Sequence, residues 1–339
     1  MRGAGDILLI SCYELGHQPA GIAMPLGFLA RAGYPASAID LSVEKLDPNR
    51  VARAKFIGIS VPMHTALRIG AKALARVREI NPACHVAFFG LYASLNEAYL
   101  LSHGADSVIG GEYEGPLLAL IERLAGEAGS ADSIEGVSLK SEKETPLLAH
   151  LPFAVPERDG LPPLMKYAHL EENGERRVAG YVEASRGCRH LCRHCPIPPV
   201  YDGRFFLVPA ETVLEDIRNL VRMGATHITF GDPDFLNGPN HSLKIVRGMR
   251  AEFPDLTFDF TAKVEHLLKH RALIPEFAAL GCRFIVSAVE SLSDTVLTHL
   301  AKDHTRADVV EALKIARAAK IPLRPSLVPF TPWTTLDDL

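Results

Sequence analysis

The sequence predicts an α/β protein with two successive domains. Short apolar runs of strand length alternate with segments of helical periodicity over residues 6–127, and the same alternation returns over residues 181–339. Residues 128–180 interrupt it. With 339 residues, of which 47% are hydrophobic, the chain has enough apolar material for two domains of ordinary size.

The first domain is expected to be a parallel sheet of the flavodoxin or Rossmann type, because five strand-like runs alternate with helices. The clearest helix has apolar residues at helical spacing from Ala66 to Val77. It ends before Asn81-Pro82, since proline cannot easily continue a helix. The expected strands are Ile7–Ile10, Ser37–Leu41, Phe56–Ser60, Val86–Phe89 and Ser107–Ile109.

Residues 128–180 are expected to be a linker or a segment that wraps around a domain. They contain a Gly/Ala/Ser/Asp stretch, a mixed-charge stretch at 140–144 and a proline-rich stretch at 151–164 that excludes regular helix. We therefore place the limits of the two domains at 1–127 and 181–339.

The second domain is expected to be a full or partial (β/α) barrel. Apolar spacing over 213–221 predicts its first helix, and Thr305 with Asp308 predicts a capping box that opens a helix over 307–319. Another helix is expected to begin at Thr334. A closed barrel would need more chain, so we expect a fragment truncated at its C-terminus or a sheet completed by another segment. The expected strands are Tyr181–Ser185, Thr226–Phe230, Leu256–Thr261, Cys282–Ser287 and Ile321–Val328.

The composition argues against two classes of partner. The 36 Lys and Arg residues nearly balance the 40 Asp and Glu residues, so the net charge of −4 creates no field that favours nucleic acid or an anionic membrane. The apolar run Ile7–Ile10 is too short for a signal-peptide core or a membrane span. We expect a cytoplasmic protein that binds neither nucleic acid nor membrane.

Three of the six cysteines, Cys188, Cys192 and Cys195, directly follow a predicted strand. They occupy the loop at its carboxyl end, where βα folds place their functional residues. In the reducing cytoplasm this clustering indicates metal ligation rather than disulfides. The C-x3-C-x2-C spacing suits three corners of a [4Fe–4S] cluster whose fourth iron stays open. A structural zinc site completed by His190 or His194 is the alternative.

This segment resembles the radical S-adenosylmethionine (SAM) enzymes, whose hallmark is the same cysteine spacing after the first barrel strand. The resemblance covers residues 181–339. It implies that SAM chelates the open iron and is cleaved by one electron from the reduced cluster. It also implies an electron donor such as flavodoxin or ferredoxin, and a small-molecule or peptide substrate. His194 stands where the family usually has a carbocyclic aromatic residue, and its imidazole could shield or hydrogen-bond the SAM adenine.

Two later segments resemble further motifs of that family. The first runs from Gly231 to Phe235, and the resemblance implies that Asp232 or Asp234 meets the SAM ammonium group. A plain turn is the alternative. The second contains Glu290 and Ser291, and here the resemblance implies a contact with the SAM ribose hydroxyls. Alternatively, Ser291 is only the N-cap of a helix.

Residues 6–127 resemble the cobalamin-binding domain that precedes many radical SAM barrels, in the phrases 57–61 and 110–114. A corrin would then lie at the carboxyl edge of the sheet. Residues 12–17 lack the Asp-x-His-x-x-Gly motif that supplies a histidine to cobalt, and Leu91 replaces the second glycine of the usual Gly-Gly pair. The alternative is a domain that keeps the fold but only packs on the barrel or binds substrate.

The sequence therefore predicts a radical SAM enzyme. Methyl transfer to an unactivated carbon or phosphorus is expected if cobalamin binds, and hydrogen abstraction followed by rearrangement or coupling if it does not. The rival interpretation is a non-catalytic zinc-binding or interaction module.

Overall fold

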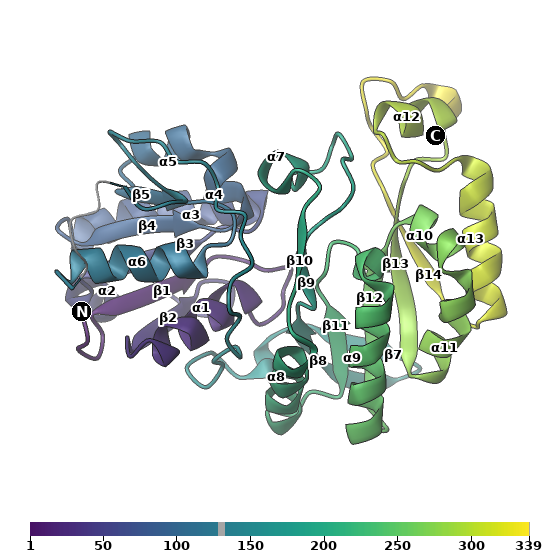
Figure 1. Ribbon diagram of the computed structural model, residues 1–339, viewed down its shortest axis with the longest axis horizontal. Helices are drawn as coiled ribbons and strands as arrows, with labels where there is room; N and C mark the ends of the chain where they lie inside the picture. Colours follow the sequence, from purple (N-terminus) through teal and green to yellow (C-terminus); the bar gives the residue numbers. More distant parts are fainter. Residues whose placement is uncertain (128–132, 339) are drawn as a thin grey trace. The chain divides into compact units, whose positions relative to one another are not determined.

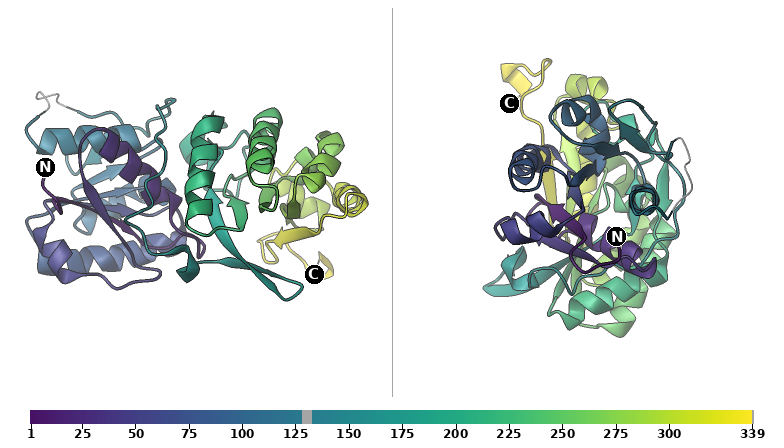
Figure 2. Two further views of the ribbon diagram at one scale, coloured as in Figure 1. Left: turned by 90° about the horizontal axis from the view of Figure 1, so that it is seen from below. Right: turned by 90° about the vertical axis from the view of Figure 1, so that its left-hand side faces the viewer.

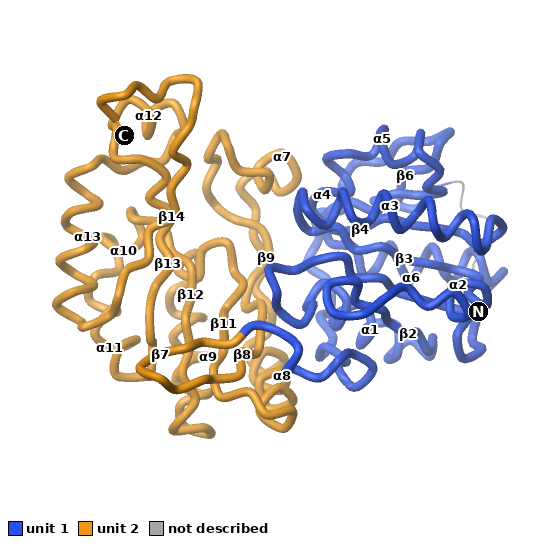
Figure 3. The backbone as a smooth tube through the Cα atoms, turned by 180° about the vertical axis from the view of Figure 1, so that it is seen from behind, with its two compact units in different colours: residues 1–168 blue, residues 169–339 orange. Residues whose placement is uncertain are grey.

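The computed structural model describes residues 1–127 and 133–338, which divide into two compact units (Figures 1 and 3). The first unit comprises residues 1–168 and the second residues 169–339. No helix among the described residues is long and apolar enough to span a bilayer.

The first unit contains a six-stranded sheet in the order β2-β1-β3-β4-β5-β6. The first five strands are parallel and confirm the predicted flavodoxin-like order, whereas β6 pairs antiparallel with β5. The strands are β1 Ile7–Ser11, β2 Ala36–Asp40, β3 Phe56–Ser60, β4 His85–Phe89, β5 Ser107–Ile109 and β6 Val137–Leu139. The helices are α1 Ala20–Arg31, α2 Pro48–Arg53, α3 His64–Ile80, α4 Leu91–Leu95, α5 Glu97–Ser102 and α6 Glu114–Leu124, with a 3₁₀ turn η1 at Leu164–Lys166.

Helices cover both faces of this sheet. One core cluster joins the sheet to α1 and α6, and a second joins its other face to α2, α3, α4 and α5. The helix predicted from Ala66 to Val77 is confirmed within α3, which ends before Asn81. Strand β6 lies within the segment predicted to be a linker, and its three residues are too few to stand out in a hydrophobicity pattern.

The second unit contains a curled sheet in the order β14-β13-β12-β11-β8-β7. Strands β8 to β14 of this sheet are parallel, and β7 forms an antiparallel hairpin with β8. The long helices lie along one face (Figure 2, left), so the sheet is a partial barrel. The strands are β7 His169–Glu172, β8 Glu175–Val182, β9 Ser185–Gly187, β10 Phe205–Leu207, β11 His227–Phe230, β12 Thr257–Ala262, β13 Cys282–Glu290 and β14 Leu323–Leu327. The helices are α7 Pro198–Tyr201, α8 Ala210–Arg222, α9 Pro239–Glu252, α10 Val264–Lys269, α11 Ile274–Ala279, α12 Asp294–His299 and α13 Arg306–Ala318, with 3₁₀ turns η2 Phe235–Asn237, η3 Arg271–Leu273 and η4 Leu336–Asp338.

The first strand of this unit differs from its prediction. Instead of one strand over Tyr181–Ser185, β8 begins at Glu175, and Ser185 starts the separate strand β9. The hairpin turn is Asn173-Gly174, both with positive φ, which is a favoured two-residue turn. The sequence prediction missed this strand start because β8 begins with charged rather than apolar residues.

An aromatic cluster holds the sheet of the second unit to its helices. Phe230, Phe235, Phe258, Phe260 and Phe277 are all 1% exposed or less, and their rings pack with one another. Burying rings of this size accounts for a large share of the unit's hydrophobic stabilisation.

The ends of two elements in this unit were also predicted. The predicted capping box between Thr305 and Asp308 is present and opens α13. The helix expected from Thr334 is the 3₁₀ turn η4 in the described residues, and Leu339 lies outside them.

Strand β14 is an edge strand that contains Pro325.

Candidate active site

The cysteine loop spans residues 188–204 and is closed at its base by the two-stranded ribbon of β9 and β10. The N–H of Cys188 donates to the carbonyl of Arg204 at 3.1 Å. Gly187 has a φ of +75°, and a Cβ atom there would lie 2.4 Å from the Arg204 carbonyl oxygen and 2.6 Å from the Tyr201 ring. Only glycine fits both the left-handed conformation and this close approach, so the residue before the first cysteine is fixed by the loop's geometry.

All three loop cysteines carry free thiols. Cys188 and Cys192 are 8% and 7% exposed, and Cys195 is half-buried. Burial raises the pKa of the Cys188 thiol, and its hydrogen bond from Asn237, at 3.6 Å from Nδ2 to Sγ, acts in the opposite direction. Burial likewise raises the pKa of Cys195. Two buried thiols and one half-buried thiol on one loop, with an amide donor to one of them, fit an iron–sulfur cluster.

The zinc alternative is not favoured by this geometry. In a tetrahedral zinc site with bonds of about 2.0–2.3 Å, ligand atoms lie roughly 3.3–3.8 Å apart. Among the described residues, two groups bring three ligand atoms within 4.8 Å of one another, and neither contains a cysteine. His190 instead lies beside Asp234 and Lys263, and His194 beside Glu290. In the described residues the thiols are therefore not gathered with a histidine at the separations of a zinc site.

Asp232 holds the start of the cysteine loop to the end of β11. Its two carboxylate oxygens accept hydrogen bonds from the Ala184 N–H at 2.9 Å and from the Ser185 hydroxyl at 2.5 Å. The side chain is buried, and this burial raises the pKa of Asp232 to about 7. Asp232 thus stabilises the chain just before the cysteines, and a contact with SAM remains a prediction.

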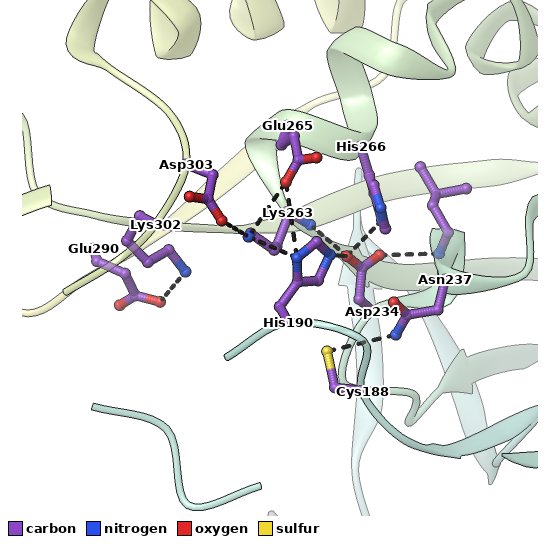
Figure 4. A network of polar contacts seen from close by, with 11 residues as sticks. Cys188, His190, Asp234, Asn237, Lys263, Glu265, His266, Glu290, Lys302 and Asp303 are labelled. Atoms are coloured by element: carbon purple, nitrogen blue, oxygen red, sulfur yellow. Dashed lines mark hydrogen bonds and ion pairs between the residues drawn. The ribbon is translucent and has the colours of Figure 1, made fainter. Parts of the chain in front are cut away.

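Asp234 lies at the centre of a polar network beside the cysteine loop (Figure 4). Its Oδ1 caps η2 by accepting from the Leu236 N–H at 3.0 Å, and its Oδ2 is 2.8 Å from His266 Nδ1. His190, from the cysteine loop, points into the same network, with Nδ1 2.9 Å from Lys263 Nζ. Burial, followed by the charge of Lys263, lowers the pKa of His190 to about 4.

Glu290 ends β13 with a φ of +64° and forms a second polar group. Its Oε1 lies 3.3 Å from Lys302 Nζ and 3.5 Å from His194 Nε2. Burial raises the pKa of Glu290, but the hydrogen bond from His194 and the charge of Lys302 together outweigh this effect, so the net pKa is lowered. Glu290 and His194, both predicted to contact SAM, are therefore neighbours.

Ser291 is placed differently from its alternative interpretation as a helix N-cap. The N-cap of α12 is Ser293, and the Ser291 hydroxyl accepts a hydrogen bond from the Ser293 N–H at 3.1 Å. A contact between Ser291 and ribose stays a prediction.

A comparison with known protein families decides the identity of this region. The family described as the Radical SAM superfamily matches residues 182–337. These residues form a radical SAM domain. The match includes the cysteine loop, Asp232, Asp234 and Glu290, and it agrees with the resemblance seen in the sequence.

Curated relatives of the radical SAM chain are distant and longer. A putative methylthiotransferase of Methanocaldococcus jannaschii is 23% identical over 77% of this chain and 57% of its own length. An uncharacterized methyltransferase of Pyrococcus horikoshii is 23% identical over 88% of this chain and 66% of its own length. The chain thus spans between about half and two thirds of these relatives.

Two solved radical SAM structures share the fold of both units. TsrM from Kitasatospora setae, a methyltransferase solved with cobalamin and a [4Fe–4S] cluster, aligns with a TM-score of 0.77 over 98% of this chain and 68% of its own, at 15% identity. The cobalamin-dependent enzyme OxsB, solved with aqua-cobalamin and SAM, aligns with a TM-score of 0.78 over 98% of this chain and 50% of its own, at 18% identity. At these identities the likeness establishes the fold.

The carboxyl edge of the first unit is the place where a cobalamin could lie, since the strand order reverses between β1 and β3. Four apolar or aromatic side chains lie just beyond the ends of β1, β3 and β4. Leu15 is 62% exposed, whereas Tyr13, Met63 and Tyr92 are half-buried and pack against the core. Leu91, the residue that departs from the cobalamin-domain pattern, is half-buried at the same edge.

Four residues of the site were missed in the sequence. Asn237, Lys263, His266 and Lys302 all contact predicted site residues or the cysteine loop. Lys263 had a usable signal, because a charged residue directly after a buried strand is unusual. The others lie in helical or loop segments where a polar residue is ordinary, so only tertiary structure reveals them.

Proposed function

We propose that this chain is a cobalamin-dependent radical SAM methyltransferase. The observation that carries the proposal is the loop of two buried thiols and one half-buried thiol at the carboxyl end of a partial barrel, preceded by a flavodoxin-like unit with an apolar carboxyl edge. The limits derived from the sequence, 1–127 and 181–339, stay the proposed limits of the two functional domains, while β6, β7 and the start of β8 extend the two sheets into residues 128–180.

In this proposal each side chain of the site has its own role. Cys188, Cys192 and Cys195 hold three irons, and the Asn237 amide stabilises the Cys188 thiolate by donating to it. Glu290, kept ionised by His194 and Lys302, accepts from the ribose hydroxyls. When bound, the cluster, SAM and cobalamin supply the one-electron cleavage and the methyl carrier.

We further propose a small-molecule or peptide substrate, and electron delivery in the cytoplasm by a flavodoxin or ferredoxin. The tryptophan-bound structure of TsrM is a precedent for a small substrate on this fold. Methylthio transfer is the second candidate, because several curated relatives are named for it.

Anaerobic reconstitution tests the proposal. We expect about four irons and four sulfides per chain, with the cluster absorbance lost in Cys192→Ala. Cys282→Ala is the matched control, since Cys282 is buried in β13 and should not affect iron content. A folded, colourless, iron-poor wild-type protein would contradict the radical SAM assignment.

Gel filtration after addition of hydroxocobalamin tests the second cofactor. Retention of about one cobalamin per chain, followed by methyl transfer from SAM, supports a methyltransferase. Cluster-dependent SAM cleavage without cobalamin retention would favour the second candidate.

A further inference from the structure

Two buried ring nitrogens beside Asp234 have no hydrogen-bond partner among the described residues: His190 Nε2 and His266 Nδ1. His266 Nδ1 lies 2.8 Å from Asp234 Oδ2 without the geometry of a hydrogen bond, and His190 Nε2 lies 3.7 Å from the same oxygen. The three side chains are 5%, 12% and 1% exposed in the order His266, His190, Asp234. Leaving a buried polar atom without a partner costs free energy, so such atoms call for an explanation.

We propose that His190, Asp234 and His266 bind a divalent transition-metal ion, in a site separate from the cysteine loop's cluster. Their ligand atoms all lie within 4.8 Å of one another. Tetrahedral coordination with bonds of about 2.0–2.1 Å places ligand atoms roughly 3.3 Å apart. The two distances to Asp234 Oδ2, 2.8 Å and 3.7 Å, lie on either side of that value. The two ring nitrogens lie within 4.8 Å of each other, so small rotations of the side chains would bring all three ligand atoms to a common ion.

The ligand set indicates which metal binds. Two imidazoles and one carboxylate form the three-ligand site typical of zinc with an open fourth position, and a related set binds ferrous iron. Calcium and magnesium prefer oxygen ligands alone. Zinc is therefore the ion we assign, with the open position available to water.

The neighbouring side chains complete the hydrogen bonding of the metal-bound state. Metal at His190 Nε2 puts the ring proton on Nδ1, which then needs an acceptor. Glu265 Oε2 lies 3.7 Å from this Nδ1 and can supply it. In the structure the Lys263 ammonium donates to Nδ1 at 2.9 Å, so metal binding requires it to move away from the protonated Nδ1; Glu265 at 3.4 Å and Asp303 at 3.6 Å remain as its partners. A carboxylate behind a ligating histidine is the common arrangement in metal sites.

Another buried histidine of the same unit provides a contrast. His227 is 1% exposed, and both of its ring nitrogens have partners: Nδ1 lies 2.8 Å from the Thr257 hydroxyl and Nε2 lies 2.8 Å from Asp259 Oδ2. His304 Nδ1 also lacks a partner, but it belongs to neither of the groups of described residues that could hold a metal, so the convergence of ligand atoms marks the site and not the unpartnered nitrogen alone. His190 and His266 each leave one nitrogen directed at the same carboxylate oxygen instead.

Zinc titration of the cluster-reconstituted chain tests the site and does not depend on the proposed methyl transfer. After equilibrium dialysis, we expect one zinc per chain in addition to the cluster iron. Zinc X-ray absorption should report only nitrogen and oxygen ligands at about 2.0–2.1 Å, without sulfur at about 2.3 Å. Bound zinc with sulfur ligands, or no zinc retained at micromolar free concentration, would overturn the proposal.

Substitutions locate the zinc within the chain. His266→Ala and Asp234→Asn should each weaken zinc binding at least tenfold, and Glu265→Gln about tenfold as a supporting residue. His270→Ala is the matched control, because its ring packs on His266 at 5.6 Å yet belongs to neither ligand group. Wild-type affinity in folded His266→Ala would also overturn the proposal.

A triple variant separates this site from the cluster. Cys188→Ala, Cys192→Ala and Cys195→Ala together cannot hold a cluster and should still bind one zinc. If cluster reconstitution fails but the triple variant binds zinc, the radical SAM assignment fails and the zinc site stands. If the triple variant is folded by circular dichroism but binds none, the zinc site fails.

Discussion

The carboxyl edges of the two sheets use buried charge differently. In the first unit, two buried carboxylates at this edge contact the backbone and a hydroxyl group: Glu14 accepts from the Gly21 N–H, and Asp40 accepts from the Tyr167 hydroxyl. In the second unit, Lys263 and Glu290 contact other ionisable side chains. Buried charges need partners in fixed positions. The first edge therefore offers shape and apolar surface, whereas the second offers a set of interdependent polar groups.

The largest effect is expected from Gly187→Ala in the cysteine loop. The new Cβ would collide with the Arg204 carbonyl in a left-handed conformation, so the ribbon must open, and most of the iron should be lost on reconstitution. Gly203→Ala is the control, since its φ is also positive, at +73°, but its nearest atoms lie at 3.5 Å or more. It should cost only about 1 kcal/mol and keep the cluster. Equal iron contents in the two variants would show that the loop is not held as described.

Asp232→Asn should change how stability depends on pH. Burial raises the pKa of Asp232 to about 7 from 3.8, so the folded state keeps a proton that the unfolded chain has released. Stability should therefore fall as pH rises from about 4 to about 7 and then level off. The substitution should remove this slope and cost about 2 kcal/mol through a lost hydrogen bond. Urea unfolding at several pH values measures both, with Asp308→Asn on α13 expected to keep the wild-type slope.

Glu290→Gln should weaken SAM binding about tenfold, because the amide cannot replace an ionised acceptor held by Lys302 and His194. Isothermal titration of the reconstituted protein with SAM measures this change. Glu276→Gln, which removes an exposed contact with Arg247, is the control and should bind SAM normally. If Glu290→Gln binds SAM with unchanged affinity, Glu290 does not contact the SAM ribose.

The smallest effect is expected at the carboxyl edge of the first unit's sheet, where we expect the shape of the surface rather than its charge to determine how tightly cobalamin binds. Leu91→Gly should tighten cobalamin binding about threefold if Leu91 crowds the cofactor, at the cost of about 1 kcal/mol of helix stability. Leu95→Gly carries the same helix penalty in α4 but lies four residues further on, 38% exposed. Only the first substitution should alter retention of hydroxocobalamin. An equal change in hydroxocobalamin retention in both variants would show that Leu91 does not contact the corrin.

The parts of the fold that sequence could predict are those with a local signal. The strand Phe56–Ser60 and the helix ending before Asn81 follow from hydrophobic periodicity and from proline. The cysteine spacing is equally local. By contrast, the β7–β8 hairpin is charged, and β6 has three residues that pair only because β5 is already in place.

The same distinction between local signals and tertiary contacts applies to the site. Glu290 was predicted from its motif, but its partner Lys302 lies 12 residues away, and the Asp232 contact with Ser185 spans 47. Asp232 illustrates the limit most clearly: its motif position implied a contact with SAM, which stays a prediction, but did not reveal that its oxygens accept from the Ala184 N–H and the Ser185 hydroxyl. Such pairings depend on which strand ends meet, and no window of sequence reports that.

Strand β14 has a consequence for self-association. The Val328 N–H bonds to the Glu290 carbonyl on β13, so by alternation Leu323, Pro325 and Leu327 direct their backbone groups away from the sheet. Pro325 has no N–H to offer on that side. A second molecule therefore meets an interrupted row of hydrogen-bonding groups, which protects this strand against edge-to-edge aggregation although four of its five residues are exposed.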